Sequence, residues 1–247
     1  MLNFIEDNLF ISPTPIKLAE EVAGWFYLQL TDSSKPHYVA ISGGSTPVLF
    51  FNSLAAKYGP RINWKNIHIF WADEKCVPPS NNESNFKVAK VHLLSKIDIP
   101  ENNIHRIKGE EEPNVEVKRY TEEILSVVPH VNDLPCFDIV LLGMGSDGHV
   151  ASIFEGQENV IFSGNIVEMA YNPENNQRRI TLTPYCINNA NKVAFQISGL
   201  VKANIIKEIL NNGSKSHIYP AKQIKPSNGD LYWFLDSGAA SGLIIKD

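Results

Sequence analysis

Cysteine is scarce in this sequence, and the cysteines present are not spaced as pairs. Cys76, Cys136 and Cys186 lie far apart, and no C-x-x-C pair occurs in the 247 residues. This spacing argues against a zinc ribbon or a redox dithiol and favours a reduced, cytoplasmic setting. The N-terminus lacks a basic region followed by an apolar core, so we expect no signal peptide. The strongest apolar run, 137–142, is too short to span a bilayer, so we expect no membrane partner.

Positive charge is also in short supply. The chain has 22 Lys and Arg against 27 Asp and Glu, a net charge of −5 and a pI near 5.8. A nucleic-acid-binding protein normally shows a basic excess, so we expect no nucleic-acid partner, although a few local cations suffice to bind a small anion. The apolar fraction of 43% is typical of a globular protein, and the length permits one large domain or two small ones. Because we find no linker and no internal repeat, we expect a single domain over 1–247.

Segments typical of strands alternate with segments typical of helices. We expect helices after Thr14, from Pro47 with Thr46 as its cap, and after Ser84, and further helices over 116–127 and 200–210. The expected strands are 37–41, 67–72, 137–142, 166–170, 180–183, 193–198 and 231–235. This alternation predicts an α/β fold in which a parallel sheet has helices on both faces. Ligands of such sheets bind beyond the carboxyl ends of the strands, so the segments that follow strands are the candidates for a site.

A glycine-rich segment, Gly43-Gly44-Ser45-Thr46-Pro47, follows the first central strand. Its glycines allow a close approach of the backbone, its two hydroxyls can donate, and the helix start presents free N–H groups. These properties predict a phosphate site, whereas a tight turn with an ordinary helix cap explains the same residues equally well. The segment is not a Walker A loop, because no Lys follows the second glycine.

Two carboxylates and a cation, Asp73, Glu74 and Lys75, follow the next strand. They are suited to contacting sugar hydroxyls or to orienting a catalytic group. A metal site is the weaker interpretation, since no second cluster at ligand spacing accompanies them. A solvated acidic loop is the simplest interpretation of these residues taken alone.

The segment Gly143-Met144-Gly145-Ser146-Asp147-Gly148-His149 comes directly after the most apolar strand. It matches G-x-G-x-x-G, and Glu168 lies 20 residues beyond the last glycine, which is the pattern of a dinucleotide site. Against that interpretation, glycines at 156 and 164 interrupt the stretch where a helix would have to form, and Asp147 would face the pyrophosphate. We favour His149 as a general base that activates water, because an imidazole titrates near neutral pH.

Cations follow two later strands or precede them. Arg178 and Arg179 precede the strand over 180–183, and Lys202 lies near the start of the helix over 200–210. Each alone is more often a solvated surface charge. Together they can close over a phosphate held by the loop at 43–46.

This combination of segments resembles the family of 6-phosphogluconolactonases related to glucosamine-6-phosphate deaminases. The segment 141–152 is the most specific, and the order and spacing of the matches cover nearly the whole chain. The matching segments are 41–47, 73–78, 83–85, 137–154, 179–183 and 199–202.

The resemblance implies a Rossmann-like single domain that hydrolyses a small phosphorylated sugar lactone without metal or other cofactor, as a monomer or small homo-oligomer. It implies His149 as the catalytic base and Asp73 in the active site. The residues it implies for substrate or phosphate binding are Gly43, Gly44, Ser45, Thr46, Lys75, Gly145, Asp147, Arg179 and Lys202.

The sequence departs from the family pattern at two positions. Lys75 stands where lactonases carry Arg, and it keeps the charge without the bidentate fork. Glu155 stands where lactonases carry Pro. The alternative is the deaminase, whose loop has a glutamate five residues after the histidine. Here that position is Phe154, which follows the lactonase pattern.

Overall fold

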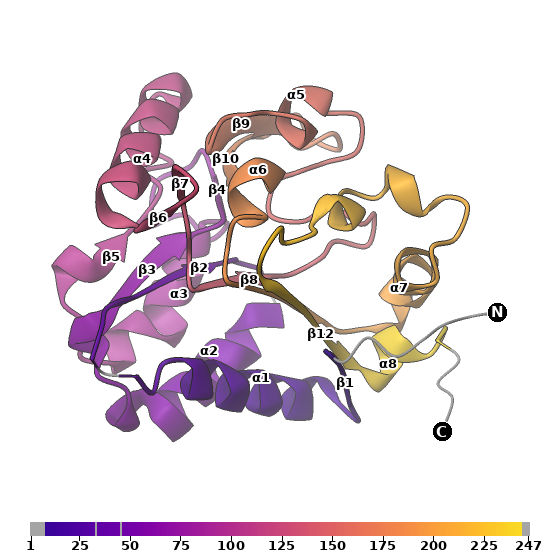
Figure 1. Ribbon diagram of the computed structural model, residues 1–247, viewed down its shortest axis with the longest axis horizontal. Coiled ribbons are helices and arrows are strands. Elements are labelled where there is room, and N and C mark those ends of the chain that lie inside the picture. Colours follow the sequence, from indigo (N-terminus) through magenta and orange to yellow (C-terminus); the bar gives the residue numbers. More distant parts are fainter. Residues whose placement is uncertain (1–7, 33, 45, 244–247) are drawn as a thin grey trace.

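The computed structural model describes residues 8–32, 34–44 and 46–243, and its centre is a seven-stranded parallel sheet (Figure 1). The order β1-β12-β11-β8-β2-β3-β5 places β8 and β2 side by side in the interior of the sheet. All four residues of β8 are buried, which is why its sequence is a continuous apolar run. The strands are β1 Leu9–Ser12, β2 His37–Ile41, β3 Ile67–Trp71, β5 Ile104–His105, β8 Ile139–Leu142, β11 Lys192–Ile197 and β12 Asp230–Asp236.

Helices lie on both sides of this sheet, as predicted. In the view of Figure 1, α1, α2 and α3 lie below it, whereas α4, α5 and α6 lie above it. The helices are α1 Pro15–Gln29, α2 Thr46–Tyr58, α3 Asn85–His92, α4 Pro113–Val127, α5 Glu158–Ile161, α6 Pro184–Ile187, α7 Ala203–Leu210 and α8 Ser237–Ala240. The N-caps predicted at Thr14 and Ser84 are confirmed, since each side chain accepts a hydrogen bond from the backbone three residues on.

Three helix starts differ from the prediction, and one of them is that of α4, which begins at Pro113 instead of residue 116. Helix α2 begins at Thr46 itself instead of after it. The predicted helix over 200–210 is divided into a short 3-10 helix, Leu200–Lys202, and α7. Gly199 precedes this segment with a φ of 104°, a conformation that glycine adopts without strain.

Three further strands form a separate antiparallel sheet, where the alternation alone predicted one parallel sheet. Strand β10 (Arg178–Leu182) pairs with β4 (Asp73–Lys75) on one side and with β9 (Val167–Tyr171) on the other. The connection from β9 to β10 is too short for a crossover, so these strands must form a hairpin. The strands predicted near 166–170 and 180–183 are therefore real, but they do not belong to the central sheet. A small hairpin of β6 (His130–Val131) and β7 (Leu134–Pro135) completes the strands.

The register of the central strands aligns three of their carboxyl ends. Ile41, at the end of β2, lies opposite Trp71 of β3 and Leu141 of β8. The loops that follow these strands therefore start at the same edge of the sheet. Those loops contain the glycine-rich segment, the segment with His149, and the entry to β4.

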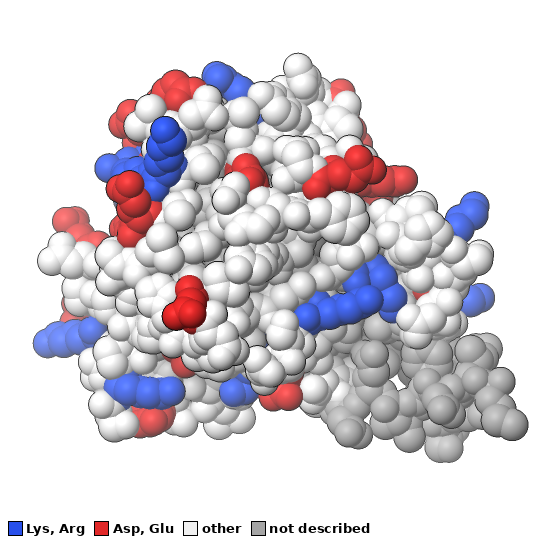
Figure 2. All heavy atoms as spheres, turned by 45° about the horizontal axis from the view of Figure 1, so that its top comes forward, with Lys and Arg blue, Asp and Glu red and all other residues white. Residues whose placement is uncertain are grey.

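Figure 2 shows one face of the protein, on which acidic and basic side chains are interspersed both within the face and along its rim, with uncharged surface between them. This mixture agrees with the mildly acidic composition. Among the described residues, no helix is long and apolar enough to cross a membrane.

Candidate active site

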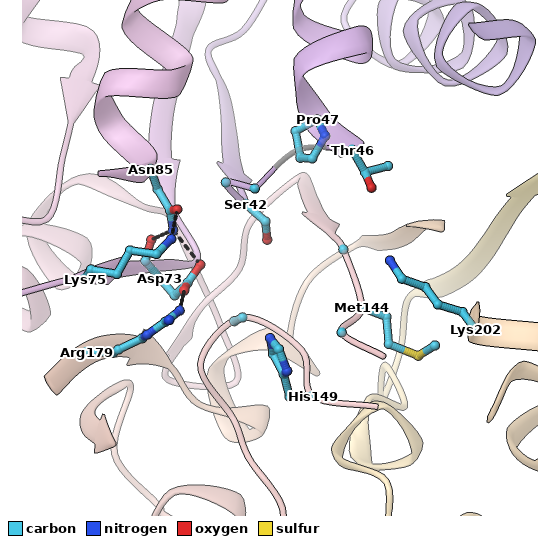
Figure 3. A pocket seen from close by; sticks show the side chains of 15 residues that line it. Ser42, Thr46, Pro47, Asp73, Lys75, Asn85, Met144, His149, Arg179 and Lys202 are labelled. Carbon is cyan, nitrogen blue, oxygen red and sulfur yellow. Dashed lines mark hydrogen bonds and ion pairs between the residues drawn. The ribbon is translucent and has the colours of Figure 1, made fainter. Parts of the chain in front are cut away.

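One pocket opens at the aligned carboxyl ends of β2, β3 and β8, and most of the predicted site residues line it (Figure 3). Of the residues predicted to bind or react, those that line it are Gly43, Gly44, Thr46, Asp73, Lys75, Gly145, His149, Arg179 and Lys202. Asp147 reaches the pocket only through its contact with His149, and Ser45 lies outside the described residues. The glycine-rich loop and the imidazole thus open into the same pocket.

His149 and Asp147 form a hydrogen-bonded pair on the loop after β8. The Nδ1 of His149 lies 2.6 Å from Oδ1 of Asp147, and the same oxygen accepts from the backbone N–H of His149 at 3.2 Å. Burial raises the pKa of the Asp147 carboxyl, but the hydrogen bond and charge of His149 outweigh it and lower that pKa. Asp147 therefore stays ionised and can accept a hydrogen bond from a proton held on Nδ1, and Nε2 takes no part in this pair.

Gly145 is required by this pair. A Cβ at position 145 would lie 2.3 Å from Nδ1 of His149 and 2.4 Å from Oδ1 of Asp147, closer than carbon atoms approach. Of the three glycines of G-x-G-x-x-G, Gly145 is therefore the one that leaves room for the histidine pair. No helix follows the loop directly, because the next one, α5, begins only at Glu158 and has four residues.

A tight turn follows His149 and returns the chain beneath it. Val150 and Ile153 form a bridge, with Ala151 between them at a φ of 49°, in the left-handed region that alanine rarely adopts. Ser152, at the tip, donates its hydroxyl to Oδ2 of Asp73 at 2.7 Å. The turn thus fixes the histidine loop to the second sheet.

Asp73 is buried, and neighbouring side chains hydrogen-bond to both of its oxygens. Oδ1 accepts from Nδ2 of Asn85 at 3.0 Å, and Oδ2 accepts from Ser152. Nη1 of Arg179 lies 4.0 Å from Oδ2. Asp73 lines the pocket, and its carboxylate also holds three functional segments together.

Asn85 is a site residue that the sequence analysis did not single out. It is buried against the pocket, accepts from Nζ of Lys75, and donates to the backbone and side chain of Asp73. A Cβ on Gly43 would lie 2.1 Å from Oδ1 of Asn85, so glycine is needed there for packing as well as for ligand approach. Two signals in the sequence pointed to this stretch, the helix-cap pattern at Ser84 and the family resemblance over 83–85.

Glu74 points away from the pocket and caps α3, although the sequence grouped it with Asp73 and Lys75. Its carboxylate accepts from Ser84 Oγ and from the backbone N–H groups of Lys75, Asn85 and Phe86. Burial raises the pKa of Glu74, and these backbone hydrogen bonds partly oppose the rise. Its function is to hold the start of α3, and with it Asn85, at the edge of the pocket.

Cations face the pocket from two sides. Lys75 and Arg179 lie directly opposite each other in the pairing of β4 with β10, and Figure 3 shows Lys202 on the other side of the pocket, with His149 between. Burial lowers the pKa of Lys202, and the nearby charge of Asp236 partly opposes this. No hydrogen bond or ion pair joins Nζ of Lys202 to another described residue. Three cations around a small pocket predict an anionic ligand.

The family model of glucosamine-6-phosphate isomerases/6-phosphogluconolactonase matches residues 13–233. The chain belongs to this family. Within it, the chain is 41% identical to the 6-phosphogluconolactonase of Haemophilus influenzae, over 94% of this chain and 98% of that protein. It is also 32% identical to the 6-phosphogluconolactonase of Treponema pallidum, over 77% and 87% of the two chains.

Solved structures of family members have the same fold. The crystal structure of devB protein superposes with a TM-score of 0.89 at 37% identity, over 96% of this chain and 99% of that one. The 6-phosphogluconolactonase of Trypanosoma brucei gives a TM-score of 0.84 at 26% identity, over 96% and 98%. A monomeric glucosamine-6-phosphate deaminase gives 0.81 at 19% identity, over 96% and 100%, which shows a shared fold alone.

Proposed function

We propose that the protein hydrolyses 6-phospho-D-glucono-1,5-lactone to 6-phosphogluconate, the lactonase step of the oxidative pentose phosphate pathway. The observation that carries this proposal is the His149–Asp147 pair facing the same pocket as the glycine-rich loop and three cations. The His149–Asp147 pair suits activation of water, and the glycine-rich loop with its three cations suits a phosphorylated substrate. The names of the relatives at 41% and 32% identity support the same substrate.

In the proposed mechanism, Nε2 of neutral His149 removes a proton from water as the water oxygen attacks the lactone carbonyl. Asp147 holds the proton on Nδ1 and stabilises the imidazolium that forms. The tetrahedral intermediate then collapses, the bond from C1 to the ring oxygen breaks, and His149 returns its proton to that oxygen. The products are a carboxylic acid and a hydroxyl group, and the acid ionises at neutral pH.

We propose that the phosphate binds at the start of α2, on the loop at 43–46, with Arg179 and Lys202 as its cationic contacts. Helix starts present free N–H groups and a partial positive charge, which favour a dianion. This remote anchor would hold the carbonyl near His149. Lys75 takes part through Asn85, which accepts a hydrogen bond from its Nζ.

Neither a metal ion nor an organic cofactor is required by this mechanism, because lactone hydrolysis is redox-neutral and His149 supplies the base. Among the described residues, no group of three or more His, Cys, Asp or Glu side chains is placed to hold a metal ion. We further propose that the chain works as one domain, in the cytoplasm, as a monomer or small homo-oligomer.

The test is acid release from freshly prepared 6-phosphogluconolactone, measured beside ammonia release from glucosamine 6-phosphate. We expect acid release well above the spontaneous rate and no ammonia release, since Phe154 occupies the position of the deaminase glutamate. Ammonia release without lactonase activity would replace this proposal with the deaminase. If neither acid release nor ammonia release is detected, both the lactonase and the deaminase assignments fail.

A further inference from the structure

Phe154 contacts two functional side chains at once. Its ring centroid lies 4.7 Å from that of the His149 imidazole, at an interplanar angle of 41°. On the same ring, the Cζ of Arg179 lies 5.8 Å from the centroid. Phe154 itself is 2% exposed, so its ring is buried beside these two side chains.

The chain takes an unfavourable conformation to place this ring. Phe154 follows His149 by only five residues, and the left-handed Ala151 within the turn at 150–153 brings it back beneath the imidazole. Such a conformation is unfavourable for alanine and persists where the surroundings hold it. Here the hydrogen bonds of Ser152 to Asp73 and to Thr181 hold the turn.

We propose that Phe154 is a positioning residue of the reaction: its ring holds the His149 imidazole against Asp147 and separates it from the guanidinium of Arg179. This inference rests on the proposed lactone hydrolysis. The imidazole side chain is 30% exposed, and its contacts with Asp147 and Phe154 leave Nε2 directed to the pocket. When His149 takes the proton from water, imidazolium and guanidinium both lie by the electron-rich ring, which stabilises each cation and keeps them apart.

A carboxylate in place of the ring would change the base directly. It would lie beside both His149 and Arg179, and an opposite charge at that distance favours the protonated imidazole. Other titratable groups also face the imidazole or its loop, so their charges must be kept constant in the test. These groups are Asp73, Lys75, Asp147, Arg179, Lys202 and Tyr219.

The experiment compares Phe154→Leu, Phe154→Gln and Phe154→Glu with the wild-type protein. The matched control is Phe137→Leu, which changes another buried phenylalanine, one that packs on Phe70 in the core. Two readouts are used: the pH profile of kcat/KM, and the NMR titration of the His149 ring in protein without substrate. Thermal unfolding confirms that each variant is folded.

We expect Phe154→Leu to lower kcat roughly 10- to 100-fold with a smaller change in KM, because a misplaced base loses rate more than binding. We expect Phe154→Glu to move the His149 titration and the acidic limb of the profile upward by about one pH unit or more. We expect Phe154→Gln to move both slightly downward, because the ring that stabilises the imidazolium is lost without a charge in its place. The control keeps the wild-type profile. Equal titrations of the Glu and Gln variants, or a kcat of the Leu variant equal to that of the control, would overturn the inference.

The two readouts separate this inference from the proposed function. If the wild-type protein fails to hydrolyse the lactone, the proposed function fails, while the NMR titration still reports whether position 154 acts on His149. If the lactonase activity is present and the NMR titration of His149 does not change with the residue at position 154, only the positioning role fails.

Discussion

The hydroxyl of Ser152 donates a 2.7 Å hydrogen bond to the Asp73 carboxylate, although 79 residues separate the two in the chain. Both groups are buried. This bond fixes the turn after His149 to strand β4 of the second sheet. The position of the proposed base is therefore coupled to a strand that lies outside the parallel sheet.

Replacement of Ser152 by alanine should destabilise the protein and lower its activity together. The change leaves Oδ2 of Asp73 without this donor, and an unsatisfied buried polar group costs about 1–3 kcal/mol. Denaturant unfolding and kcat measure the two effects. The exposed Ser95→Ala is the control and should change neither; a Ser152→Ala protein indistinguishable from it would show that the bond is unimportant.

Replacement of His149 by alanine should lower kcat by about 10²–10⁴-fold, the usual contribution of general base catalysis. Asp147→Asn should also lower kcat, because an amide can no longer hold the proton on Nδ1 in the same way. Both variants should keep the wild-type circular dichroism spectrum. Unchanged turnover of His149→Ala would remove this residue from the mechanism.

Replacement of Lys202 by alanine should raise KM for the phosphorylated lactone far more than for glucono-1,5-lactone. We expect the increase in KM to be about tenfold or more larger for the phosphorylated lactone, which corresponds to about 1.4 kcal/mol of binding free energy. The control is Lys207→Ala, an exposed lysine on the neighbouring helix α7. Equal losses for both substrates would contradict phosphate anchoring by Lys202.

Glu123 should stabilise the folded protein at neutral pH and lose this contribution at acid pH. Burial raises the pKa of Glu123, but the hydrogen bonds from His105 and Arg119 outweigh it and lower that pKa below 4.5. A lowered carboxyl pKa gives stability that is present above the unfolded value and is lost as the pH falls through the folded value.

Urea unfolding of Glu123→Gln should therefore show a deficit at pH 7 that disappears as the pH falls through the acid range below 4.5. The exposed neighbour Glu122→Gln is the control and should behave like the wild-type protein at every pH. A deficit that stayed constant down to the acid range would assign the role of Glu123 to packing.

The sequence predicts the five inner strands of the central sheet because they are largely apolar and alternate with capped helices, but it misses the short edge strands β1 and β5. The run at 137–142 and the caps at Thr14 and Ser84 depend only on local patterns, and the structure confirms each. The loops after β2 and β8 can be placed together by the rule that parallel strands end at one edge.

The second sheet and the buried network escaped the sequence analysis. Strand β4 has only three residues, all of them charged, so no hydrophobic pattern marks it. Asn85 and Ser152 become site residues only through contacts with Asp73, and such contacts depend on how distant segments pack. Successive residues of a strand point to opposite faces, which is why Glu74 points away from Asp73. Because strand β4 was not predicted, the two carboxylates looked equivalent in the sequence.

The pairing of β4 with β10 has a consequence for the binding of ligands. Lys75 and Arg179 lie directly opposite each other there, and like charges in such cross-strand pairs repel. A dianion bound between the strands and the loop relieves this repulsion, so an anionic ligand should raise the melting temperature of the protein. In the proposed reaction, hydrolysis converts an uncharged carbonyl into a second anionic group, so we expect these cations to bind the product more tightly than the lactone.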